Sequence, residues 1–191
     1  MTTSDPAQGF FTGQLLIAMP TMPDPRFART VIYMCAHSDE GALGLVINKL
    51  FDDLNFEDLL DQVGIEPETC KRSIPVHSGG PVESGRGFVL HSQEFTDEST
   101  MVVDDQVALT ASIDILRAIA HGDGPRNCLL ALGYSGWGPG QLESEIHENG
   151  WLNVPADEAL IFDTDLENKW QRAIAKIGVD FAKLSGQSGR A

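Results

Sequence analysis

Three short apolar runs follow one another near the start of the chain, and only turn-forming segments separate them. The runs cover residues 15–19, 29–36 and 43–47. Three prolines lie between the first two runs, and the sequence SDEG at 38–41 separates the last two. Apolar runs joined by short turns pair as antiparallel strands. The start of the chain therefore predicts an antiparallel sheet.

The rest of the chain mixes strand and helix patterns in an irregular order. Apolar runs predict strands at 74–77, 87–91, 100–103, 129–132, 151–154 and 159–162. Helical spacing and capping residues predict about four helices, at 56–63, 113–120, 139–146 and 166–177. Regular strand–helix–strand alternation is absent, so we expect an α+β fold with a mostly antiparallel, curled sheet. That sheet should contain Ile17, Ile32, Val46, Val89 and Leu130.

The length of 191 residues fits one domain. We predict that it spans residues 13–184, after a loose segment at 1–12 and before a disordered tail at 185–191. The formal net charge of −15 argues against nucleic-acid and anionic-membrane binding, both of which depend on lysine and arginine. No apolar run approaches the roughly 20 residues of a membrane-spanning helix.

The three cysteines, Cys35, Cys70 and Cys128, show no metal-binding or redox spacing. Cys35 and Cys128 adjoin apolar runs and are expected to be small buried side chains. The N-terminus has neither a basic region nor an apolar signal core, so we expect a cytoplasmic protein.

The glycine-rich segment after residues 129–132 suggests two chemical sites, and both fit poorly. Gly136, Gly138 and Gly140 match neither standard phosphate-loop pattern. No lysine or arginine lies between Arg126 and Lys169, whereas eight acids do, so a structural loop is favoured over nucleotide binding. Ser135 resembles the serine of a hydrolase elbow, but Trp137 stands where that motif requires glycine.

Titratable side chains also give no catalytic pattern. The five histidines lack metal-ligand spacing, and three of them precede serine where a strand should end, so we expect them to bond to loop backbone. Glu143 and Glu145 would point about 200° apart on a helix, so they do not form a catalytic pair. We therefore predict no catalytic residue, no metal and no cofactor.

Four strings together resemble the YqgE/AlgH family of bacterial proteins. They are GQLLIAMP at 13–20, GLVINK at 44–49, GGPV followed by RGFVLH at 79–91, and ALGYSGWGPGQLE at 131–143. The likeness runs from about residue 9 to residue 183. Ser135 departs from it, because a small residue such as alanine is expected there. The resemblance implies a single α+β domain around a bent, pseudo-barrel sheet, in a cytosolic protein without an established activity.

Members of that family are often labelled transcriptional regulators, but this sequence has no helix-turn-helix, and its pI is near 4.5. We expect a non-enzymatic accessory or regulatory protein that binds another protein or a small ligand, favouring a monomer. The alternative is an enzyme or ligand-binding protein whose site lies in the signature loops. Direct DNA binding would have to use the helix at 166–177.

Seven polar or aromatic residues in or between these strings are candidates for a functional surface. A rigid sheet would hold them on loops, where functional residues concentrate. The alternative is that they only lock the loops together. The candidates are Arg29, His37, Asn48, Arg86, His91, Trp137 and Glu143.

The last predicted helix carries an apolar stripe with the helical period: Leu166, Trp170, Ala173, Ile174 and Ile177. We expect this stripe to pack on the sheet of its own chain, rather than to form a partner-binding surface. Its basic residues, Lys169, Arg172 and Lys176, should then lie at the rim and face acidic residues. Under that arrangement Lys169→Ala would have little effect.

Overall fold

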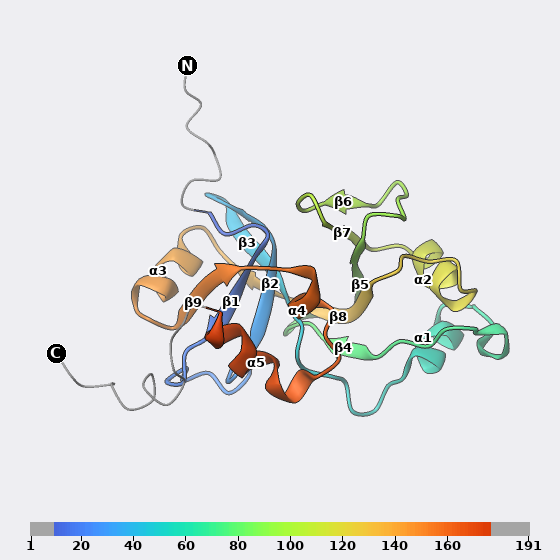
Figure 1. The fold of residues 1–191 in the computed structure, drawn as a ribbon, viewed down its shortest axis with the longest axis horizontal. Helices are drawn as coiled ribbons and strands as arrows, with labels where there is room; N and C mark the ends of the chain where they lie inside the picture. Colours follow the sequence, from blue (N-terminus) through green and yellow to red (C-terminus); the bar gives the residue numbers. More distant parts are fainter. Residues whose placement is uncertain (1–9, 177–191) are drawn as a thin grey trace, which may run out of the picture.

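The computed structural model describes residues 10–176, and one curled sheet extends through this part of the chain (Figure 1). Its nine strands lie in the order β6-β7-β5-β8-β3-β2-β1-β9, with β4 paired to β8. Only the β4–β8 pairing is parallel among the described strands. The strands are β1 Gln14–Ala18, β2 Val31–Ser38, β3 Gly41–Val46, β4 Val76–Ser78, β5 Val82–Ser92, β6 Met101–Val102, β7 Val107–Thr110, β8 Cys128–Trp137 and β9 Trp151–Pro155.

This arrangement confirms the predicted α+β fold with a mostly antiparallel sheet. The strands that contain Ile17, Ile32, Val46, Val89 and Leu130 all belong to that sheet, as expected. The tight turn between β2 and β3 depends on Gly41, which has a φ of +140°. A Cβ at this position would lie 2.5 Å from the carbonyl oxygen of Trp137, so a larger residue would push β3 away from β8.

Strand β8 joins the two halves of the sheet. Its first residues pair with β5, and its last residues, Ser135 to Trp137, pair with β3. The prediction that the glycine-rich segment forms a loop from residue 133 is therefore wrong, because the strand continues to Trp137. Gly133 has a φ of +78°, and a Cβ there would lie 2.5 Å from the Gly80 carbonyl oxygen. This glycine permits close backbone approach inside a bent strand.

Five α-helices, together with a 3-10 turn at Pro67–Thr69, accompany the strands in the described part of the chain. Helices α1 and α2 pack on one half of the sheet, against side chains that include Val89 of β5 and Leu130 of β8. Helix α3 packs on the other half, beside Met34 of β2. Helices α4 and α5 cover the opposite face of the sheet, which carries the largest apolar cluster. Their bounds are α1 Phe56–Gln62, α2 Ile113–Ala120, α3 Gln141–His147, α4 Glu158–Ile161 and α5 Leu166–Ala175.

Two elements differ from the prediction. Residues 159–162 were expected to form a strand, but they lie in and beside α4, where the Asp157 side chain accepts a 2.7 Å hydrogen bond from the Leu160 N–H. Four consecutive apolar residues do not distinguish a strand from one helical turn, whereas an aspartate cap favours the helix. Strand β7 was not predicted, because its four residues are too few to show a periodic pattern.

Helix α5 packs its apolar stripe on the sheet of its own chain, as predicted. Trp170, Ala173 and Ile174 are buried, and the Trp170 indole donates a 2.8 Å hydrogen bond to the Ala18 carbonyl of β1. The alternative, in which the apolar stripe is an exposed surface for a partner, is therefore wrong for these three residues. Ile177 lies outside the described residues, as do the predicted tail at 185–191 and most of the N-terminal segment.

The position of Lys169 contradicts the expectation that it lies at the rim. Its side chain is fully buried, and its ammonium nitrogen donates to the carbonyl oxygens of Ile47 at 3.1 Å and Ile161 at 2.9 Å. The reason is that α4 and the segment after β3 cover this side of α5. Arg172 and Lys176 do lie at the rim, and they pair with Asp163 and Asp157 as predicted.

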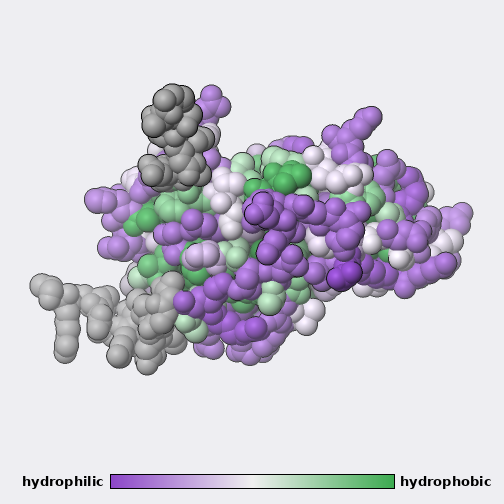
Figure 2. Space-filling view, turned by 45° about the horizontal axis from the view of Figure 1, so that its top comes forward, coloured by the Kyte–Doolittle hydropathy of each residue, from purple (hydrophilic) through white to green (hydrophobic). Residues whose placement is uncertain are grey.

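Polar residues cover most of the face seen in Figure 2, and they interrupt its apolar areas. Large exposed apolar side chains among the described residues are Leu50, Met101, Val102 and Ile113. Leu50 and Ile113 are isolated, as is normal on protein surfaces, and Met101 and Val102 are neighbours in β6. No helix between residues 10 and 176 combines the length and apolarity needed to cross a bilayer.

Candidate functional site

The seven predicted site residues do not converge on one site. Asn48 bridges two segments, because its side chain accepts a 2.9 Å hydrogen bond from the Val31 N–H and donates another of 2.9 Å to the Arg29 carbonyl. The Arg29 guanidinium stacks 4.6 Å from the centre of the Trp170 ring. Arg86 is exposed and lies 3.8 Å from Glu83. These contacts favour a role in holding loops and strands together.

His91 is also held by structural contacts. Its ring nitrogens lie 2.7 Å from the Ser92 carbonyl and 2.7 Å from the Thr110 hydroxyl, and the side chain has no exposed surface. Burial lowers the pKa of His91, which favours the neutral ring. His77 similarly lies 3.1 Å from the Leu130 carbonyl. Both histidines thus contact backbone, but the carbonyls belong to strands β5 and β8, so the prediction of loop partners is wrong for these two.

His37 and Glu143 are a second predicted pair that the fold brings together, here through their side chains. The Phe11 N–H donates a 2.9 Å hydrogen bond to His37 Nδ1, so the neutral ring carries its proton on Nε2. That nitrogen lies 3.3 Å from a Glu143 carboxylate oxygen, but not in hydrogen-bond geometry. Phe10 and Phe11 pack against the ring. This packing makes His37 an anchor for the segment that precedes β1.

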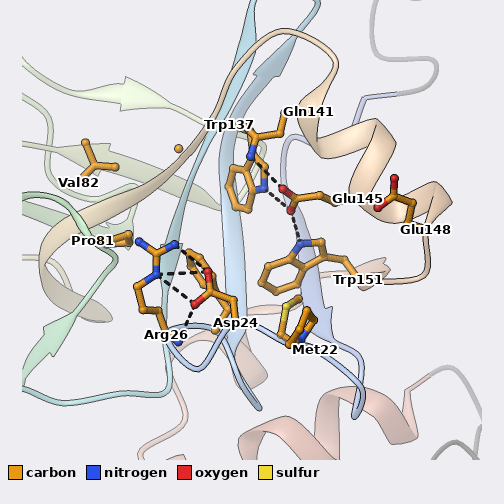
Figure 3. A pocket seen from close by; sticks show the side chains of 14 residues that line it. Met22, Asp24, Arg26, Pro81, Val82, Trp137, Gln141, Glu145, Glu148 and Trp151 are labelled. Carbon is orange, nitrogen blue, oxygen red and sulfur yellow. Dashed lines mark hydrogen bonds and ion pairs between the residues drawn. The ribbon is translucent and has the colours of Figure 1, made fainter.

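Trp137 instead lines a pocket of about 480 Å³ between α3, β9 and the proline-rich segment before β2 (Figure 3). We call this cavity the Trp pocket. This volume lies within the range of about 300–1,000 Å³ that is usual for small-molecule sites. Its main lining side chains are Met22, Arg26, Phe27, Trp137, Glu145 and Trp151.

Glu145 is the central polar group of the Trp pocket. One carboxylate oxygen accepts the indole N–H of Trp137 at 3.0 Å and that of Trp151 at 2.9 Å, and the other accepts the Gln141 amide at 2.9 Å. The two indole rings meet edge to face with centres 6.1 Å apart. Three neutral donors thus fix a negatively charged group between two aromatic rings.

A second charged group lies across the pocket from Glu145 (Figure 3). The Arg26 guanidinium pairs with Asp24 through contacts of 2.7–3.3 Å. The pairing lowers the pKa of Asp24 and raises that of Arg26, chiefly through the side-chain hydrogen bonds. Both groups therefore stay ionised, and their charges cancel.

Of these pocket residues, only Trp137 was predicted from the sequence; Arg26, Glu145 and Trp151 were not. The rejection of Glu143 and Glu145 as a pair was sound, since Glu143 faces His37 and Glu145 faces the indoles. A usable signal was present, because Trp137 and Trp151 flank the short helix that carries Glu145. Sequence alone does not show that this helix turns its carboxylate toward both rings.

The charged side chains that line the pocket are three carboxylates and one guanidinium. Among residues 10–176, those that line it include no histidine, lysine, cysteine, serine, threonine or tyrosine. Ser135 is fully buried, and its hydroxyl donates to the Gly79 carbonyl at 3.3 Å, so it does not act as an exposed nucleophile. Within residues 10–176 no three metal-ligating side chains cluster.

Glu145→Ala should lower the free energy of unfolding by about 2 kcal/mol, because three donors lose their acceptor in a half-buried site. Thermal unfolding measures this loss. In a ¹H–¹⁵N spectrum the indole signals of Trp137 and Trp151 should shift, while that of Trp170, which donates to Ala18, stays in place.

Glu143→Ala is the matched control for this variant, because it removes a carboxylate from the same helix that contacts no indole. All three indole signals should keep their positions in that protein. Unchanged indole signals in Glu145→Ala itself would contradict the bridging role of Glu145.

Comparison with known proteins supplies an independent observation. Residues 15–182 match the AlgH-like family. A UPF0301 protein of Nitrobacter hamburgensis is 54% identical, over 99% of this chain and 91% of that protein. A UPF0301 protein of Rhodospirillum rubrum is 50% identical, over 96% of each chain.

Two solved structures are similar over nearly the whole chain. The solution structure of the AlgH protein from Pseudomonas aeruginosa matches with a TM-score of 0.78 and 42% identity, and the match covers 100% of both chains. A crystal structure of a Corynebacterium diphtheriae protein matches with a TM-score of 0.74 at 20% identity, over 97% of this chain and 94% of that one. The second likeness concerns the fold alone.

Proposed function

This chain belongs to the AlgH-like family, and from that premise we propose that it is a non-enzymatic accessory or regulatory protein that binds its ligand or partner in the Trp pocket. The observation that carries the proposal is the lining of the pocket. It combines aromatic walls with carboxylates and a guanidinium, and no serine, cysteine, lysine or histidine stands among the described residues that line it, which favours binding over nucleophilic or histidine-assisted catalysis. The alternative, an enzyme with a site in the signature loops, has no such support.

Direct DNA binding is not part of the proposal. The basic helix that could serve it, α5, buries Lys169 and pairs Arg172 and Lys176 with aspartates. These side chains therefore have little charge to offer to phosphates, and the chain as a whole carries −15. The three free cysteines agree with a reducing compartment, which supports the cytoplasmic assignment we propose.

The proposal predicts that capture of a ligand or partner depends on the pocket wall. Immobilised protein is exposed to a bacterial extract, and the retained proteins and small molecules are identified by mass spectrometry. Phe27→Ala removes a pocket ring that packs edge to face on Trp151 at 5.7 Å. We expect it to lose a component that the wild type retains, roughly tenfold or more, because aromatic contacts dominate such sites.

Phe95→Ala is the matched control. Phe95 is equally a half-buried ring with an edge-to-face contact, at 6.0 Å from His91, and it lies outside the Trp pocket. Thermal unfolding of both variants shows whether each protein folds. Equal retention by all three proteins would overturn the proposal, and consumption of a small molecule by the wild type would favour the enzyme alternative.

A further inference from the structure

We propose that the Trp pocket selects a small organic cation, a substituted ammonium or guanidinium group; this inference rests on the proposed function of the pocket as a binding site. Three features of the pocket bear on the ligand: the charge of its lining, the hydrogen bonds of the Glu145 carboxylate and the two indole rings. Each of these features favours a positive ligand over a neutral or negative one.

The charged residues of the lining leave an excess of negative charge. They are three carboxylates, on Asp24, Glu145 and Glu148, and one guanidinium, on Arg26, which gives a net charge of −2. Asp24 cancels Arg26 through its paired contacts, so the excess belongs to Glu145 and Glu148. Glu148 is exposed, and within residues 10–176 no lysine or arginine forms an ion pair with it. An anionic ligand would meet repulsion from the pocket and from the acidic chain around it.

The Glu145 carboxylate receives hydrogen bonds from neutral groups only, and it can accept one further hydrogen bond. Its three donors are neutral N–H groups, which orient the carboxylate without cancelling its charge. One oxygen accepts two indoles, whereas the other accepts only the Gln141 amide. A carboxylate oxygen has two acceptor positions, so one position remains for a donor on the ligand.

The indole rings add a second source of attraction. Both Trp137 and Trp151 donate their N–H to the same carboxylate, and donation to an anion increases the electron density of the ring. A cation near the face of tryptophan gains more than one near tyrosine or phenylalanine. Phe27 and Met22 complete an apolar wall on which the substituents of an organic cation can pack.

Choline and its uncharged isostere 3,3-dimethyl-1-butanol test this inference, because they share a shape and differ in charge. Titration of the folded protein is followed through the indole signals of its ¹H–¹⁵N spectrum. Choline should shift the signals of Trp137 and Trp151 and leave that of Trp170 unchanged, with an affinity at least about tenfold above that of the isostere. Added salt should weaken choline binding only.

Glu148→Gln provides the test by substitution, since the Glu148 side chain is exposed and the change should leave the fold intact. It should weaken choline binding by about threefold to tenfold. Glu68→Gln, an exposed carboxylate outside the Trp pocket, is the control and should leave choline binding unchanged.

The outcomes separate this inference from the proposed function. Equal binding of choline and the isostere would overturn cation selection and leave the pocket as a binding site. The same conclusion would follow if neither compound bound while the wild type still retained, from the bacterial extract, a component that the Phe27→Ala variant does not retain. Binding of neither compound and no dependence of capture on Phe27 would overturn both proposals.

Discussion

Truncation after Phe162 should leave a chain that no longer folds cooperatively. The deletion removes α5, whose Trp170 and Ile174 are almost fully buried in the main apolar cluster beside Leu15 and Tyr33. Removing a buried tryptophan costs about 3–5 kcal/mol and a buried isoleucine about 2–5 kcal/mol. Since a domain has only about 5–15 kcal/mol of stability, these losses consume most of it.

Lost hydrogen bonds add to the effect of this truncation. The carbonyl of Ala18 loses the Trp170 indole, and those of Ile47 and Ile161 lose the Lys169 ammonium. Each buried carbonyl left without a donor costs about 1–3 kcal/mol. The damage therefore reaches β1, the end of β3 and α4 at once.

Thermal unfolding followed by circular dichroism measures the result. A second truncation, after Lys176, removes only residues beyond α5, so the difference between the two proteins reports the helix itself. Arg172→Ala removes an exposed ion pair of the same helix and should change stability by about 0–1 kcal/mol. An unchanged melting temperature after truncation at Phe162 would show that α5 does not support the sheet.

The sheet could be predicted because its signals are local. Consecutive apolar runs and a glycine turn specify the β1–β2–β3 pairing, and Asn55 caps α1 through a 2.8 Å bond from the Asp58 N–H. Residues in β8 were harder to assign, because glycines such as Gly133 indicate a loop unless a neighbouring strand is known to require close approach. The Trp pocket was missed for the same reason, since Glu145 meets Trp137 and Trp151 only after α3 has its final orientation.

Lys169 shows most clearly that helical periodicity alone does not determine whether a residue at the edge of an apolar stripe is buried. On an ideal helix it lies roughly 80° from the centre of the apolar stripe, which is a boundary position. Such a residue is exposed if nothing covers that side of the helix, and buried if another element does. Here α4 covers it, and those residues were predicted to be a strand. One wrong element therefore produced one wrong burial assignment.

Replacing Lys169 by alanine should destabilise the protein by about 2–4 kcal/mol at pH 7. The change leaves a cavity and two carbonyls without a donor, and relief from burying a charge offsets part of that loss. Lys176→Ala, which breaks an exposed ion pair with Asp157, should cost about 0–1 kcal/mol. Chemical denaturation of both variants measures the contrast.

The pH dependence of this difference identifies the buried ammonium. Burial lowers the pKa of Lys169 from 10.5 to about 8. Between these values the unfolded chain binds more protons than the folded one, so stability from this group rises with pH. Its neighbour His77 has its pKa lowered by burial to about 4 and does not titrate in this range. The wild type should therefore gain about 2–3 kcal/mol over Lys169→Ala between pH 7 and pH 10.

Lys169→Met separates charge from volume, because it fills most of the space without an ammonium group. It should show the same widening of the difference with pH and a smaller loss than Lys169→Ala at pH 7, since less of a cavity remains. The pH dependence of stability thus measures the titration of the Lys169 ammonium, and the stability difference between the two variants measures the contribution of side-chain packing. A wild-type advantage that stays constant from pH 7 to pH 10 would mean that folding does not shift the titration of Lys169.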